Sequence, residues 1–124
     1  MTRDELFEYL LNTYDVSPEF MWKKHPKYAV FRHPENKKWF ALVMNVDPLK
    51  VGINYSPDNE IEVLDVKMNP EEISILQKAA GFKPAYHMNK EHWISIILDQ
   101  FTLGKIIPLI ANSFELTMWY VQKK

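Results

Sequence analysis

Two histidines separated by four residues are the side chains of this sequence with the widest chemical range. His87 and His92 lie in a ten-residue segment that reads PAYHMNKEHW. An imidazole can bind a metal, transfer a proton or change its charge near neutral pH. A turn centred on Asn89 and Lys90 would join two antiparallel strands and place the histidines opposite each other on one face of a hairpin. The segment is therefore the first candidate for a functional site.

Neither a metal site nor catalysis is well supported by the neighbours of this histidine pair. Zinc needs three or four protein ligands, and no third ligand is evident nearby in the sequence. Nucleophilic hydrolysis needs a hydroxyl beside a histidine and an orienting acid. Ser95 and Asp99 follow His92 on a predicted strand, out of contact with His87. A general acid–base pair of Glu91 with a histidine stays open. We expect a protein without catalytic residues, metal or cofactor.

A purely structural interpretation explains the same segment. Tyr86 and Trp93 would face each other across the turn as a core aromatic pair, and His87 with His92 could form a hydrogen bond that orders the hairpin. Asn89 tolerates the positive φ angles of tight turns. On this interpretation the segment encodes a hairpin and nothing else.

Basic residues suggest double-stranded DNA as a partner. The net charge of −1 argues against it, but residues 20–50 contain seven basic and two acidic side chains. Two hairpins could present such side chains to phosphates, and each neutralised phosphate would make binding salt-dependent. The candidate nucleic-acid-binding residues are Lys23, Lys24, Arg32, Lys37, Lys38, Lys83, His87, Asn89, Lys90 and His92. The rival hypothesis is a protein or a small ligand bound in a groove beside the sheet.

Three helices are expected around these hairpins. Thr2 and Glu5 have the spacing of a capping box at the start of a helix over 2–14. Asn69 and Pro70 begin a second helix, which a C-terminal glycine, Gly81, should end. The third helix spans 102–120, with a kink at Pro108 or a start near Lys105.

Five runs of β-branched and aromatic residues predict strands, over 27–32, 38–46, 60–68, 82–88 and 92–98. Leu49–Tyr55 is ambiguous between a turn and a short strand, and residues 56–59 form a loop. The order α-β-β-β-α-β-β-α predicts an α+β fold with a mostly antiparallel sheet of about five strands. No glycine-rich loop joins a strand to a helix, so a Rossmann or P-loop site is not supported.

Length and composition place the chain in one class. Its 124 residues, 47% of them apolar, are enough for a single domain over 1–124 with its own core. It has no cysteine, which fits a reducing cytoplasm. No run approaches the ~20 apolar residues of a membrane span, and the acidic amphipathic N-terminus is unlike a signal peptide. We expect a cytoplasmic protein with no membrane contact.

The block Tyr86 to Lys90 followed by His92-Trp93 resembles the signature of the MmcQ/YjbR family. That resemblance implies a fold similar to CyaY and to secretion-chaperone-like domains, and a "double-wing" arrangement associated with DNA binding. The family has no established catalytic residues to carry over. Further matching segments are Val30 to Arg32, Trp39 to Leu42, Val66 to Pro70, Leu98-Asp99 and Ser113 to Leu116. We therefore expect a small binding domain, with DNA as the leading partner and a protein or small ligand as the alternative.

Overall fold

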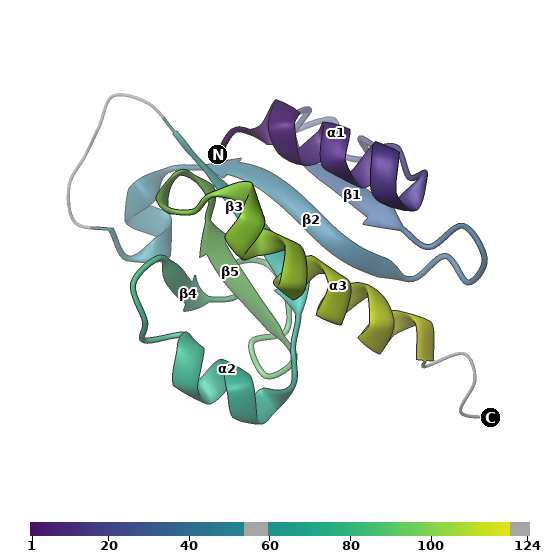
Figure 1. Ribbon diagram of the computed structural model, residues 1–124. Coiled ribbons are helices and arrows are strands. Elements are labelled where there is room, and N and C mark those ends of the chain that lie inside the picture. The colour runs from purple at the N-terminus through teal and green to yellow at the C-terminus, as the bar shows by residue number, and fades with distance from the viewer. Residues whose placement is uncertain (54–59, 120–124) are drawn as a thin grey trace.

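A computed structural model describes residues 1–53 and 60–119 (Figure 1). The helices are α1 (Arg3–Tyr14), α2 (Pro70–Leu76) and α3 (Leu103–Trp119), with short 3-10 helices η1 (Pro48–Val51) and η2 (Leu98–Gln100). The strands are β1 (Ala29–Arg32), β2 (Trp39–Val46), β3 (Ile61–Lys67), β4 (Phe82–Pro84) and β5 (Trp93–Ile97). The predicted α+β class and element order are confirmed.

The strands form one antiparallel sheet in the order β1-β2-β3-β5-β4. Three successive pairings place Leu42 beside Asp65, Asp65 beside Ser95, and Ser95 beside Lys83. Because directly paired residues share a face, this row of four side chains belongs to one face of the sheet. The same pairings place the β1–β2 turn and the β4–β5 connection at the same end of the sheet.

The helices α1 and α3 cover one face of the sheet (Figure 1). Leu6 and Leu10 of α1 and Ile106 and Ile110 of α3 are buried against alternate strand residues, such as Phe31. This is the larger of two apolar clusters, and it forms the main core.

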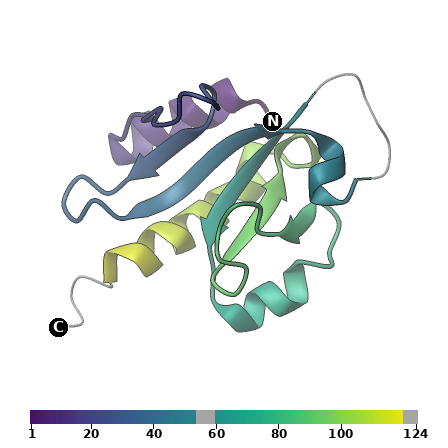
Figure 2. The same cartoon turned by 180° about the vertical axis from the view of Figure 1, so that it is seen from behind.

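Loops and one 3-10 helix cover the opposite face, which Figure 2 brings to the front. Leu42, Met44 and Val63 form its floor, and Val51 and Ile53 pack onto it from η1 and the residues that follow. The segment before β1 and the connection between β4 and β5 pack onto it as well, through Trp22, Tyr86 and Met88. Among the described residues, no α-helix packs over this face, and the covering segments are loops and η1.

The helix ends agree with the sequence in part. The capping box is present, because Thr2 Oγ1 accepts from the Glu5 N–H at 3.1 Å and the Glu5 carboxylate accepts from the Thr2 N–H at 3.4 Å. In α2 Pro70 occupies the first turn, but the Asn69 side chain makes no cap hydrogen bond. That helix ends at Leu76, before the predicted glycine.

Gly81 instead enters β4 with a φ angle of 86°. The last helix, α3, begins at Leu103 and contains Pro108. The alternative prediction, a start near Lys105, is therefore wrong. The ambiguous segment after β2 begins with the 3-10 helix η1, and the predictions for Asn54–Tyr55 and for 56–59 lie outside the described residues.

Candidate functional site

The connection between β4 and β5, residues 85–92, does not form the predicted hairpin. Phe82 pairs with Ile96 and Pro84 with Ile94, after which the chain leaves the sheet. This register differs by one residue from the predicted one, which exchanges the faces of the side chains. The predicted pairings of His87 with His92 and of Tyr86 with Trp93 are therefore wrong. The two strands are also shorter than expected, because residues 85–92 fold over the loop-covered face.

Asn89 explains why the chain turns here. Its side-chain Oδ1 accepts from the N–H groups of Glu91 at 2.8 Å and His92 at 3.1 Å. Its carbonyl oxygen accepts from the Trp93 N–H at 2.9 Å. Asparagine is common in turns because its side chain can bond the backbone two residues on. These bonds leave Asn89 Oδ1 engaged in the fold.

Ser95 attaches the start of the connection to the sheet. Its Oγ accepts from the Tyr86 N–H at 2.9 Å and donates to Asp65 Oδ1 at 2.5 Å. Asp65 is fully buried, and its Oδ2 has no hydrogen-bond partner among the described residues. Burial raises the pKa of Asp65 well above its usual value, although the Ser95 hydrogen bond and the Lys90 charge act in the opposite direction.

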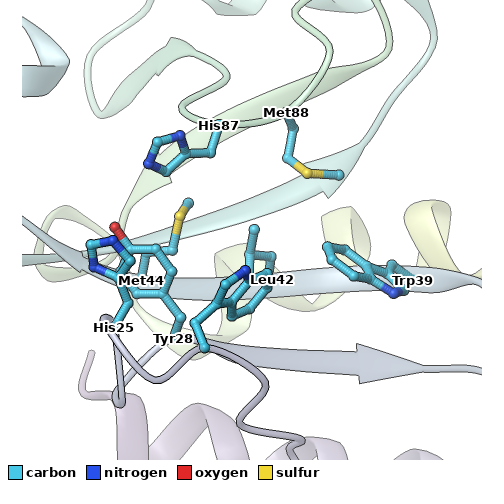
Figure 3. Close-up of a pocket in the computed structure, with 8 residues that line it drawn as sticks. His25, Tyr28, Trp39, Leu42, Met44, His87 and Met88 are labelled. Atoms are coloured by element: carbon cyan, nitrogen blue, oxygen red, sulfur yellow. The ribbon is translucent and has the colours of Figure 1, made fainter.

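A pocket of about 430 Å³ opens between the connection and the sheet (Figure 3). We call it the aromatic pocket. Figure 3 shows His87 and Met88 on one side of it, facing His25, Tyr28 and Leu42 on the other. Its lining comes from the segment before β1, from β2 and from the β4–β5 connection, and consists of Trp22, His25, Tyr28, Trp39, Leu42, Met44, His87 and Met88.

Ring contacts hold the mouth of the aromatic pocket together. His25 and Tyr28 are stacked, with ring centroids 4.3 Å apart and planes 11° apart. Trp22 meets Trp39 edge-on at 5.9 Å. Offset-stacked and edge-to-face geometries are the favourable arrangements of aromatic rings. The pocket therefore has flat aromatic walls from the segment before β1 and from the start of β2.

His87 is the polar group on the facing wall. Its backbone has a φ of 65°, a conformation that L-residues other than asparagine and aspartate rarely adopt. Its ring lies 4.1 Å from that of Tyr86 and 6.2 Å from that of Tyr28, measured between centroids. His87 is an exposed residue, but partial burial of its ring is the largest cause that lowers its pKa, and the neighbouring His25, Lys50 and Lys90 lower that pKa further. The imidazole therefore stays neutral to a lower pH than a free histidine.

A second hollow of about 270 Å³ lies on the other side of Tyr86, between η1 and the β4–β5 connection. We call it the lysine hollow, because each of these two elements contributes one lysine to its lining. Its lining residues are Lys50, Val51, Gly52, Pro84, Ala85, Tyr86 and Lys90.

The candidate DNA-binding residues do not gather on one surface. Lys83 lies on edge strand β4, whereas Lys37 and Lys38 follow the opposite edge strand β1. Four inter-strand spacings of about 4.8 Å, or about 19 Å in all, separate those edges. Lys23 and Lys24 are exposed in the turn between Trp22 and His25, at the aromatic pocket.

Several of those candidates are engaged within the protein. Arg32 forms a bidentate ion pair with Glu19, with N–O distances of 2.5 and 3.1 Å. His92 is exposed, with its Nε2 3.9 Å from the Glu91 carboxylate. Because His87 and His92 are not paired, they do not supply the two neighbouring ligands on which the metal hypothesis depended. In the described ranges no three His, Asp or Glu side chains are grouped so as to hold a metal ion.

Sequence reasoning missed most of the aromatic pocket. Trp22, Tyr28 and Met44 were not considered, and Lys50 was not linked to Lys90. No local signal joins these segments. For Asp65 a signal existed, because strand alternation places its carboxylate with Ile61 and Val63 on an apolar face.

Comparison with known proteins shows the family. The YjbR family model matches residues 11–116, and the chain belongs to the YjbR family. The uncharacterised protein YyaQ of Bacillus subtilis is 43% identical over 118 residues, covering 94% of this chain and 98% of YyaQ.

Solved structures show the same fold. A crystal structure of a Pseudomonas syringae protein is 44% identical, with a TM-score of 0.89, and covers 94% of this chain and 99% of that one. The Deinococcus radiodurans protein DR2400 is 24% identical, with a TM-score of 0.67, and covers 99% of this chain and 80% of its own, a likeness of fold alone. Within the described residues, no helix has the length and apolar character to cross a bilayer.

Proposed function

We propose that this chain is a non-enzymatic binding domain whose aromatic pocket receives the flat, apolar part of a small ligand. The observation that carries the proposal is the path of residues 85–92. This connection contains the block characteristic of the family, and it folds over the open sheet face, where His87 and Met88 form one wall of the pocket.

The size and lining of the pocket support this function. Ligand sites in proteins have volumes of roughly 300–1,000 Å³ and are mostly apolar, with a few polar groups that orient the ligand. The aromatic pocket has a volume of about 430 Å³ and is lined by six aromatic or apolar residues and two histidines. A planar ring system inserted there would contact Trp22, Trp39 and Tyr28 through their faces or edges.

The backbone of His87 also supports a binding role. A non-glycine residue in the left-handed region costs on the order of 1 kcal/mol, and such residues cluster at binding sites. The strain is offset by the Asn89 turn and by the Tyr86–Ser95 hydrogen bond that flank it. The fold thus holds the imidazole at the mouth of the pocket at some expense of stability.

The test uses 2-naphthol as a neutral planar probe, titrated by calorimetry and by NMR of the tryptophan indole N–H signals. Signals of Trp22 and Trp39 should shift, while that of the buried Trp93 stays in place. Trp39→Ala should weaken binding roughly tenfold, since loss of one ring contact costs about 1–3 kcal/mol. The matched control is Ile75→Ala, an exposed apolar residue on α2.

Equal affinity of the Trp39→Ala and Ile75→Ala variants would refute the proposal, as would shifts confined to signals outside the pocket. Circular dichroism of each variant checks that it is folded.

We also propose DNA binding as a second candidate, because one observation favours it. The β1–β2 turn with Lys37 lies at the end of the sheet where β4 ends and β5 begins, and the connection that starts there carries Lys90. Two basic connections that start at one end of the sheet support a two-winged contact with a duplex. Lys90 itself lines the lysine hollow beside η1, which follows the far end of β2, and this weakens the candidate. Against this candidate stand the Arg32–Glu19 ion pair and the separation of Lys83 from Lys37.

Fluorescence anisotropy of labelled duplex DNA across a salt series tests the second candidate. Lys37→Glu/Lys90→Glu should lower the slope of log K against log salt by about 2, because each phosphate contact contributes roughly 0.9. Lys78→Glu/Lys105→Glu changes the net charge equally at exposed sites elsewhere and serves as control. Equal slopes for the two variants would rule out binding through these connections.

A further inference from the structure

The lysine hollow places two cations beside the aromatic pocket. Lys50 follows Leu49 in η1, and Lys90 lies in the β4–β5 connection, so two elements distant in sequence each supply an ammonium group. Both side chains belong to exposed residues and line the same hollow. They are therefore free to meet a bound anion without unfolding the core.

A single residue pair separates the two hollows. Tyr86 lines the lysine hollow and His87 lines the aromatic pocket, and their rings lie 4.1 Å apart between centroids. Lys50 and Lys90 line the lysine hollow together with Tyr86, whose ring is next to that of His87. A ligand whose ring occupies the aromatic pocket needs to extend only past His87 to reach the lysines.

The two charged residues that line the lysine hollow, Lys50 and Lys90, are both positive. Four acids belong to the neighbouring segments. Asp65 lies buried below Lys90 and is bonded to Ser95, and burial favours its neutral form. Glu60 acts on Tyr28 and is bonded by the Asn45 side chain. Asp47 caps η1, where its Oδ1 accepts from the Leu49 N–H, and Glu91 follows Lys90 with its carboxylate 3.9 Å from His92 Nε2. None of these four carboxylates lines the lysine hollow.

We propose that the ligand of the aromatic pocket carries a phosphoryl group, which binds between Lys50 and Lys90. This inference rests on the proposed function, because it takes the ring of the ligand to occupy the aromatic pocket. A phosphate monoester has a charge of about −1.5 to −2 at neutral pH, which matches two ammonium groups. Lysine binds phosphate as a point charge without a demand for planar geometry. The ligand class is a phosphorylated aromatic compound of about mononucleotide size.

The experiment compares 2-naphthyl phosphate with 2-naphthol by calorimetry at pH 7.5, using the full chain. The two probes share one ring system and differ in the phosphoryl group. We expect the phosphate probe to bind roughly tenfold tighter. In Lys50→Met/Lys90→Met the ratio of the two dissociation constants should fall toward one, whereas Lys78→Met/Lys105→Met should keep the wild-type ratio.

Inorganic phosphate provides a second arm. It should displace 2-naphthyl phosphate in competition and leave bound 2-naphthol in place. A ratio near one in the wild type would overturn the phosphate inference while leaving the aromatic pocket intact as a binding site. A large ratio that survives Lys50→Met/Lys90→Met would also overturn it. Failure of both probes to bind would instead refute the proposed function itself.

Discussion

Replacing Ser95 with alanine removes one hydroxyl group that serves two buried partners. Ser95 Oγ accepts from the Tyr86 N–H at 2.9 Å and donates to Asp65 Oδ1 at 2.5 Å. Asp65 Oδ2 already has no partner among the described residues, so the substitution leaves a fully buried carboxyl group without its one described side-chain hydrogen bond. We expect Ser95→Ala to destabilise the protein and to loosen the β4–β5 connection.

The magnitude follows from these two bonds. Leaving a buried polar group without its hydrogen bond costs about 1–3 kcal/mol, with the larger values for groups that bear charge. A loss of about 1 kcal/mol at the Tyr86 N–H and about 2 kcal/mol at Asp65 gives roughly 3 kcal/mol in all. For a chain of this length the melting temperature should fall by about 4 °C per kcal/mol, hence by roughly 12 °C.

The loss should depend on pH in a defined direction. Burial raises the pKa of Asp65 in the folded state above its unfolded value of 3.8, so the contribution of this group to stability is full below that value. That contribution is lost as the pH rises from 3.8 through the folded pKa. The Ser95 hydrogen bond lowers the pKa of Asp65, so its removal raises that pKa further. The difference between wild type and Ser95→Ala should therefore increase once the pH passes the folded pKa of Asp65 in the wild type.

Thermal unfolding followed by circular dichroism at pH 4, 6 and 8 measures this difference. Ser74→Ala is the matched control, because Ser74 Oγ donates to the Glu71 carbonyl at 2.8 Å on the exposed surface of α2. We expect the control to change stability by less than about 0.5 kcal/mol. The reasoning is refuted if Ser95→Ala costs no more than Ser74→Ala. It is equally refuted if its cost is smaller at pH 8 than at pH 4.

Three further perturbations test other parts of the fold. Asp65→Asn removes a buried carboxyl group whose pKa burial raises, so the change in melting temperature from wild type to variant should be more favourable at pH 8 than at pH 4. Gly81→Ala should lower the free energy of unfolding in urea by more than about 1 kcal/mol, because φ is 86° and an added Cβ would lie 2.5 Å from the Phe101 ring. The control is Gly104→Ala, whose Cβ meets no atom within 4 Å and which should be neutral or stabilising. Burial lowers the pKa of His33, so wild-type stability should fall as the pH drops below 6.5, and His33→Gln should flatten that part of the pH–stability profile.

Local sequence signals predicted those elements whose stabilising contacts lie within a few residues of each other in the chain. The capping box of α1 needs only Thr2 and Glu5, and both of its hydrogen bonds form. Alternation along β3 places Asp65 on the same face as Val63, which is where the structure has it. The family block likewise identified the fold, because it is a long run of uncommon residues and the family model matches residues 11–116.

The same local reasoning was wrong for the β4–β5 connection. A two-residue turn at Asn89 and Lys90 is a good hairpin signal. It competes with a capped turn over 89–92 that uses the Asn89 side chain, and with burial of Ala85 and half-burial of Tyr86 and Met88 on the sheet. Burying apolar surface at about 25 cal/mol per Å² outweighs a few extra ladder hydrogen bonds.

The sequence alone determined the class of fold and the family, because these depend on periodicity and on short contiguous motifs. Only the tertiary structure decided which residues meet to form the candidate site. The aromatic pocket joins Trp22, Leu42 and Met88 from three separate segments, and the lysine hollow joins Lys50 to Lys90. The physical reason is that such contacts depend on the exact register of two strands and on which loop side chains are buried against the sheet. The local spacing of residues in the sequence predicts neither of these.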